Sequence, residues 1–130
     1  MLQIITTAKT SSERAACAAA RATGIPCAVT KPRRNGPGRR SYRTCLQDCA
    51  AKADATIVLG NHVVPYNGDI DSIRVPTPIR LLSIAAEMRF RPTGDSTRQW
   101  LRKHRVKTLH VTGSAPRSVA AKFLRALLKP

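Results

Sequence analysis

The chain has 130 residues, of which 42% are hydrophobic and only 4% aromatic, so one domain with an aliphatic core is expected. This composition excludes wholesale disorder, and apolar runs of only a few residues exclude a membrane-spanning segment. The residues after Met1 have strand character and do not form a signal peptide, so we expect a cytoplasmic protein.

The charge is strongly positive, with 23 basic and 7 acidic residues and a formal net charge of +16. Such an excess attracts phosphates, nucleic acid or anionic surfaces. The alternative interpretation is a solvated basic surface without a specific partner.

The first elements are predicted from apolar runs and capping residues. Leu2 to Thr7 is short and β-branched, which predicts a buried strand. A helix follows, opened by the capping side chains of residues 10–13 and ended by Gly24. Residues 25–29 form the second strand candidate, with Pro26 near its start.

The middle of the chain alternates irregular and regular segments. Lys31 to Arg43 has six basic residues, two prolines, two glycines and no acid, so a loop is predicted. A helix is expected over residues 42–53 and a fully buried strand over 54–60. Residues 61–78 are expected to be irregular because prolines interrupt them.

The last third of the chain repeats the alternation. Residues 79–84 have strand character, but Arg80 argues against a buried central position. A helix is predicted over 95–104, with Trp100 and Leu101 on its apolar side, and a strand over 106–111. Residues 112–116 form a turn, and apolar side chains at helical spacing predict a final helix over 118–128.

This order predicts an α/β fold, a Rossmann-like doubly wound parallel sheet of about five strands with helices on both faces. We expect residues 1–130 to form a single domain. Ligands of such sheets bind outside the carboxyl ends of the strands. The loops that follow the strands are therefore the candidate binding surface.

The loop after the first strand offers hydroxyls, charge and a helix N-terminus to an oxyanion. Its candidate ligand-binding residues are Lys9, Thr10, Ser11, Ser12 and Arg14. The loop has no glycine, so it is neither a dinucleotide-binding fingerprint nor a P-loop. Helix capping is the alternative explanation for its hydroxyls.

The loop after the last strand is the second part of the predicted site. Gly113 permits close approach of a backbone, Ser114 offers a hydroxyl, and Arg117 can make a bidentate contact with an anion. Ser118 completes this set. An ordinary strand-to-helix turn is the alternative.

Two further loops supply the remaining candidates. Arg33 and Arg34, in the basic loop, could close over a phosphate or follow a nucleic-acid backbone. Asn61 follows the third strand at the same edge. Only Tyr42 could stack on a base nearby, which argues against a reader of single strands.

Catalytic and metal-binding patterns are weak. No acid or nucleophile lies beside the three histidines in sequence, and we expect His110 to be structural. Cys45 and Cys49 are spaced to share one helix face, but Cys17 and Cys27 do not supply a second zinc-type pair. Buried, reduced thiols are the favoured interpretation of all four.

Several motifs, in the same order along the chain, resemble the putative molybdenum carrier proteins. The similar segments are Thr7 to Ala16, Gly24-Ile25-Pro26, Lys31 to Arg34, Ala53 to Leu59, Trp100-Leu101 with His104, and Val106 to Ser118. That family is related in fold to the lysine-decarboxylase-like, nucleotide-binding proteins of the Rossmann type. The resemblance implies a Rossmann-like fold and a ligand edge to which Thr10, Arg14, Arg33, Gly113 and Arg117 contribute.

Together these features predict a non-enzymatic binding or carrier domain for an anionic, phosphate-bearing small ligand. By resemblance, that ligand is the molybdenum cofactor or a nucleotide. The alternative is a basic module that binds nucleic acid or an acidic partner on a degenerate Rossmann scaffold, which the net charge favours. The alanine-rich helices leave self-association open.

Overall fold

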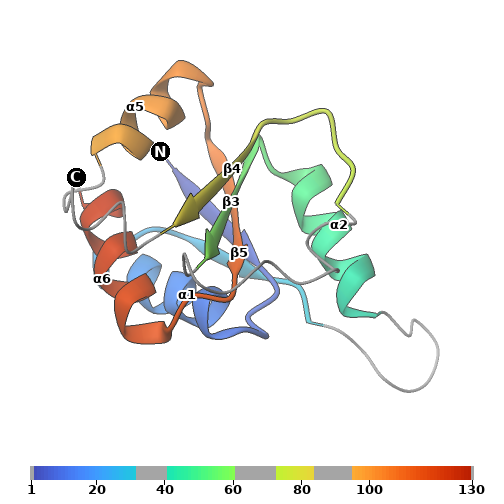
Figure 1. Ribbon diagram of the computed structural model, residues 1–130, viewed down its shortest axis with the longest axis horizontal. Helices are drawn as coiled ribbons and strands as arrows, with labels where there is room; N and C mark the ends of the chain where they lie inside the picture. The colour runs from blue at the N-terminus through green and yellow to red at the C-terminus, as the bar shows by residue number, and fades with distance from the viewer. Residues whose placement is uncertain (1, 32–40, 61–72, 84–94, 130) are drawn as a thin grey trace.

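A five-stranded, fully parallel β-sheet lies at the centre of the protein (Figure 1). The computed structural model describes residues 2–31, 41–60, 73–83 and 95–129. The strands are β1 (Gln3–Thr6), β2 (Cys27–Val29), β3 (Ala55–Gly60), β4 (Ile79–Ser83) and β5 (Thr108–Gly113). The helices are α1 (Ser11–Thr23), α2 (Tyr42–Lys52), α5 (Asp95–Lys103) and α6 (Arg117–Leu128).

The strand order is β2-β1-β5-β3-β4, so the last strand of the chain inserts between β1 and β3. Helical connections such as α1 between β1 and β2 carry the chain back to the start of a parallel neighbour. The predicted α/β class, the parallel sheet and its five strands are confirmed.

Helices cover both faces of the sheet, as the sequence predicts (Figure 1). Adjacent residues of β1 show the two faces: Ile4 packs in the cluster that α1, α5 and α6 help to form, whereas Ile5 packs on Cys49 of α2 and on Ala53, which caps that helix. This alternation follows from the two-residue period of a strand.

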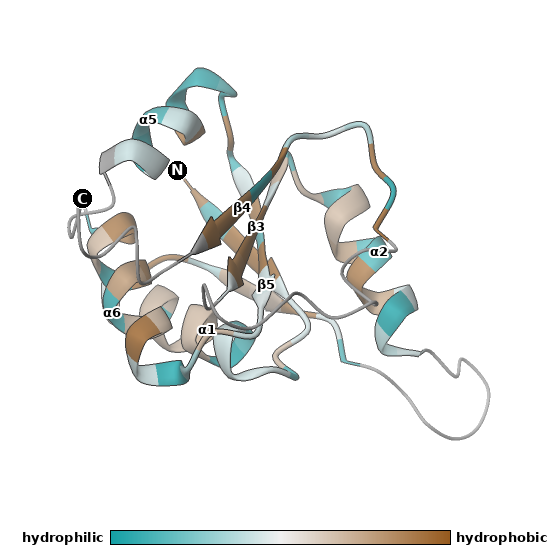
Figure 2. Ribbon diagram, in the orientation of Figure 1, coloured by the Kyte–Doolittle hydropathy of each residue, from teal (hydrophilic) through white to brown (hydrophobic). Residues whose placement is uncertain are grey.

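The central and edge strands differ in burial. Every residue of β3 is buried, whereas in β4 the side chain of Leu81 is 59% exposed. Arg80 therefore lies on an edge strand, in agreement with the sequence argument against a central position. Hydrophobic residues concentrate on the strands and hydrophilic ones on α5 (Figure 2).

Helix α1 begins and ends where its capping residues predict. Thr10 is the N-cap, and its side chain accepts a hydrogen bond from the Glu13 amide, while the Glu13 side chain accepts one from the Thr10 amide. This reciprocal pair is a capping box. Gly24 ends the helix in the left-handed conformation, with φ of 72°.

The bounds of β5 differ from the prediction. The strand runs over residues 108–113 instead of 106–111, because Thr112 and Gly113 pair with Val58 and Leu59 of β3. A side chain at Gly113 would place Cβ 2.0 Å from the Leu59 carbonyl oxygen. The close approach that requires glycine here is therefore to the neighbouring strand.

No helix in the described part of the chain is long and apolar enough to cross a membrane.

Candidate anion-binding site

The N-termini of α1 and α6 lie together at the carboxyl edge of the sheet, after β1 and β5, which pair directly. Ser11 and Ser12 each donate a hydroxyl hydrogen bond of 2.9 Å to the carbonyl oxygen of Ala115. The first and last loops, about a hundred residues apart in sequence, are thereby joined. The predicted convergence of these two loops is observed.

A buried carboxylate fills the space at the start of α1. The side chain of Glu13 is fully buried, and its Oε1 accepts hydrogen bonds from the Thr7 hydroxyl at 2.5 Å and the amides of Lys9 and Thr10 at 2.9 and 2.8 Å. Its Oε2 accepts from the hydroxyls of Tyr42 at 2.7 Å and Thr112 at 2.8 Å.

This hydrogen-bond network joins segments from three parts of the fold. Burial and the charge of Glu13 raise the pKa of Tyr42, which keeps its phenol protonated as a donor. The Lys9 ammonium lies 4.5 Å from the centre of the Tyr42 ring, in a cation–π contact. The loop after β1, the start of α2 and the end of β5 are thus fixed to one another.

The consequence for ligand binding is that α1 already holds an anion of its own. The amides of Lys9 and Thr10, which precede the first turn, donate to Glu13, and the Glu13 amide donates to the Thr10 hydroxyl, so a capping box occupies part of this helix N-terminus. The hydroxyls of Thr10, Ser11 and Ser12 are also occupied, as a cap and as links to Ala115. For these residues, capping and packing explain the side chains without a ligand.

The start of α6 is different. Pro116 is the N-cap and makes no side-chain capping bond, and no acid lies in the first turn. The first amides of a helix have no partner within it, so those of Arg117, Ser118 and Val119 are available to an anion. Ser114, just before the turn, has a buried hydroxyl oxygen without a hydrogen-bond partner in the described structure. We call residues 113–118 the α6 turn.

The predicted site residues therefore fall into three groups. Lys9, Arg14, Arg117 and Ser118 are exposed at the carboxyl edge, and Ser114 is half-buried there. Thr10, Ser11, Ser12 and Gly113 serve the fold. The positions of Arg33, Arg34 and Asn61 lie outside the described residues.

His110 is buried on β5, beneath the α2 face. Its Nδ1 lies 3.3 Å from the Thr56 hydroxyl, and its Nε2 has no partner among the described residues. Burial lowers the pKa of His110 to about 4, so the imidazole is neutral at ordinary pH. A structural role for this histidine agrees with its burial between strands.

The cysteines behave as two different pairs. Cys45 and Cys49 are fully buried on α2, and burial raises the pKa of Cys49 to about 11. Sequence reasoning missed the other pair: the sulfur atoms of Cys17 and Cys27 lie 3.1 Å apart, from α1 to β2. Sequence spacing gave no signal for this contact, which depends on how α1 packs on β2. In the described residues, no cluster of three or more metal-binding side chains occurs.

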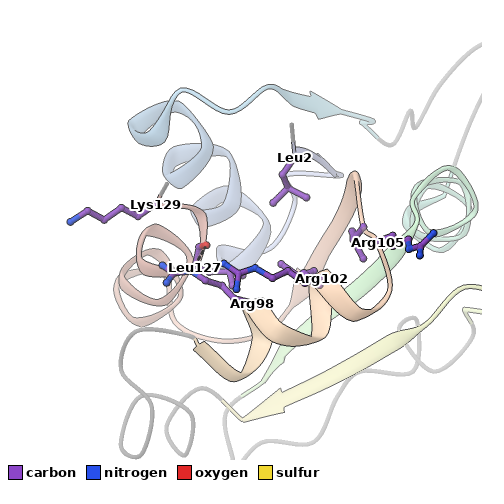
Figure 3. A pocket seen from close by; sticks show the side chains of 8 residues that line it. Leu2, Arg98, Arg102, Arg105, Leu127 and Lys129 are labelled. Carbon is purple, nitrogen blue, oxygen red and sulfur yellow. Dashed lines mark hydrogen bonds between the residues drawn. The ribbon is translucent and has the colours of Figure 1, made fainter.

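A cavity of about 350 Å³ lies at the opposite, amino edge of the sheet (Figure 3). Basic and apolar side chains line it: Leu2, Arg98, Leu101, Arg102, Arg105, Val106, Leu127 and Lys129. In Figure 3 the charged ends of Arg105 and Lys129 point away from each other, toward opposite sides of the view.

The helix ends around this cavity explain the basic side chains that line it. Helices α5 and α6 both end at this cavity, and the carboxyl end of a helix carries partial negative charge that favours basic residues. Arg98 donates to the carbonyl oxygens of Ala126 and Leu127 at the end of α6. The two helix carboxyl ends offset part of this positive charge, whereas the start of α6 presents amides and a favourable helix dipole, so we take the α6 turn as the candidate site.

Comparison with known proteins identifies one similar fold. No family model and no curated protein matches the sequence. Among solved structures, a putative molybdenum carrier protein from Syntrophus aciditrophicus SB superimposes with a TM-score of 0.78. The chain has the fold of that protein. Alignment covers 98% of this chain and 95% of the other, at 17% identity, so the sequences are divergent. The resemblance found in the sequence motifs is confirmed at the level of fold.

Proposed function

We propose that this protein is a non-enzymatic binding or carrier protein for an anionic, phosphate-bearing small ligand. The α6 turn holds the anion at the carboxyl edge of the sheet. The observation that best supports this proposal is the contrast between the two adjacent helix N-termini. Helix α1 is capped and holds Glu13, whereas α6 has neither a side-chain cap nor an acid in its first turn.

The chemistry of the α6 turn suits one phosphate or oxyanion group. Backbone amides at the start of α6 donate along the helix axis, where the helix dipole favours negative charge. Arg117 adds an exposed guanidinium that can form a bidentate pair with two oxygens. Lys9 and Arg14, exposed on the neighbouring loop and helix, add positive charge for the rest of the ligand.

The similar structure is described as a putative molybdenum carrier protein, which supports a carrier role and makes the molybdenum cofactor one ligand to test. A nucleotide is the other, because its phosphate presents the same chemistry to the turn. The internal carboxylate at α1 favours a ligand bound through a single anionic group over a pyrophosphate that spans both helices.

Calorimetric titration of the purified protein with AMP, a phosphorylated pterin, inorganic phosphate and molybdate tests the proposal. We expect saturable binding of one ligand per chain. Arg117→Ala should raise Kd by about 10- to 100-fold, the effect of losing one charge-assisted contact. Arg125→Ala is the matched control, since it removes the same charge from an exposed position at the far end of α6.

Equal losses in the two variants would show a general effect of net charge and refute a site at the α6 turn. The rival function, duplex nucleic-acid binding by the +16 surface, predicts a steep loss of affinity with salt and no small-ligand saturation. Retardation of duplex DNA at low salt with no heat from any small anion would establish the rival instead.

A further inference from the structure

Cys17 and Cys27 form a close pair of thiols away from the carboxyl edge of the sheet. Cys17 lies in the middle of α1, and Cys27 is the first residue of the edge strand β2. Their sulfur atoms are 3.1 Å apart, about 1 Å more than a disulfide bond requires. The packing of α1 on β2 therefore holds both sulfurs near bonding distance, and a small movement of the edge strand suffices to join them.

The surroundings make the two sulfurs unequal. The hydrogen bond donated by the Cys27 thiol lowers the pKa of Cys17 to about 7; burial opposes this shift, and Arg21, one turn further along α1, assists it. The same hydrogen bond and burial raise the pKa of Cys27. Cys17 is thus the more readily ionised sulfur near neutral pH and Cys27 remains the thiol, the division of roles that disulfide formation uses.

Solvent exposure also distinguishes Cys17 and Cys27 from the other two cysteines. Cys45 and Cys49 are fully buried on α2, whereas Cys17 is 9% exposed and Cys27 is half-buried. A small oxidant can reach the first pair without unfolding of the domain.

We propose that Cys17 and Cys27 are an oxidative modification site, at which a hydroperoxide converts the two thiols into a reversible disulfide between α1 and β2. The Cys17 thiolate attacks the O–O bond of hydrogen peroxide, gains one oxygen as a sulfenic acid and releases hydroxide, which takes up a proton to become water. The Cys27 sulfur then attacks the Cys17 sulfur, forms the S–S bond and displaces the oxygen as a second water. Two thiols lose two electrons and two protons in total, and the peroxide accepts them.

The disulfide would tie the edge strand to the helix that covers it. β2 has only three residues and pairs on one side, with β1. Closing the segment from residue 17 to 27 restricts the unfolded chain, so the oxidised protein should melt about 5–10 °C higher than the reduced one.

The test treats the folded, reduced wild-type protein with hydrogen peroxide, alkylates the remaining thiols under denaturing conditions and digests with trypsin. Arg21 lies between the two cysteines, so cleavage there separates them, and only a disulfide keeps their peptides together. We expect the loss of two thiols of four, a linked pair of peptides containing Cys17 and Cys27, and separation of that pair by a reductant.

Two variants sharpen the result. The double variant Cys45→Ser, Cys49→Ser is the matched control and should form the same link at the same rate. Cys27→Ser should instead leave a sulfenic acid on Cys17 that dimedone traps, whereas the wild type should give little trapped product. Oxygen added to Cys17 in the wild type without a cross-link, or a disulfide that involves Cys45 or Cys49, would overturn the proposal.

Discussion

Replacing Glu13 with alanine tests the buried network on which the carboxyl edge of the sheet depends. The carboxylate accepts five hydrogen bonds, three of them from the buried hydroxyls of Thr7, Tyr42 and Thr112. In Glu13→Ala these three hydroxyls lose their acceptor. A buried polar group left without its partner costs about 1–3 kcal/mol, and loss of a capping interaction costs about 1 kcal/mol.

The sum gives an expected loss of about 4–6 kcal/mol in the free energy of unfolding, allowing for water that enters the space. Such a loss is a large part of the stability of a small domain. Glu13→Gln should cost only about 1–2 kcal/mol, because its amide oxygen can still cap α1 and the hydroxyls can turn to accept from its NH₂ group. Thr10→Ala, which removes only the N-cap side chain, should cost about 1 kcal/mol.

Urea unfolding followed by far-ultraviolet circular dichroism measures all three variants against the wild type. If Glu13→Ala lowered the free energy of unfolding by less than about 1.5 kcal/mol, the buried network would add nothing to an ordinary helix cap, which contributes about that much, and its proposed role would be refuted. A Glu13→Gln variant as unstable as Glu13→Ala would show that the hydroxyls cannot exchange donor and acceptor roles.

Three further predictions concern the strands and helix ends. Gly113→Ala should cost more than about 3 kcal/mol in urea unfolding, because its Cβ would overlap the backbone of β3, whereas Gly24→Ala, with open space around it, should cost about 1 kcal/mol; equal losses would contradict the close packing. The pKa of His110 in the folded protein, about 4, lies below its value of about 6.5 in the unfolded chain. The free energy of unfolding should therefore be unaffected by this residue above pH 6.5 and should fall by about 3 kcal/mol as the pH drops to 4. His110→Gln should remove this component from the pH profile of unfolding, and a profile unchanged from wild type would refute it. The pKa of Asp54 is lowered by hydrogen bonds from the amides of residues 107 and 108, so Asp54→Asn should lower the melting temperature at pH 7 but not at pH 2, where wild type and variant should melt alike.

The sequence predicts most of the fold because the signals are local. The short apolar run within residues 54–60 predicts the buried strand β3, and Thr10 and Gly24 mark the ends of α1 by capping chemistry. The end of β5 was harder to predict, since Thr112 and Gly113 read as turn residues alone. They belong to the strand because β3 pairs with them.

The candidate site is predictable in position but not in detail. Parallel topology brings the loops of residues 7–12 and 113–118 together, as expected. The full role of Glu13 could not be derived, because two of its partners, Tyr42 and Thr112, come from segments distant in sequence, and only its bonds to residues 7, 9 and 10 are local. The contact between Cys17 and Cys27 escaped prediction for the same reason.

The most direct test of the central claim is a nuclear magnetic resonance titration of the ¹⁵N-labelled protein with inorganic phosphate, then with AMP, at constant ionic strength. Saturable shifts should concentrate on the amides of Arg117, Ser118 and Val119, with smaller shifts at Arg14. Amides at the amino edge, such as residues 102–106, should not respond. Shifts confined to that edge, or none that saturate, would contradict an anion site at the α6 turn.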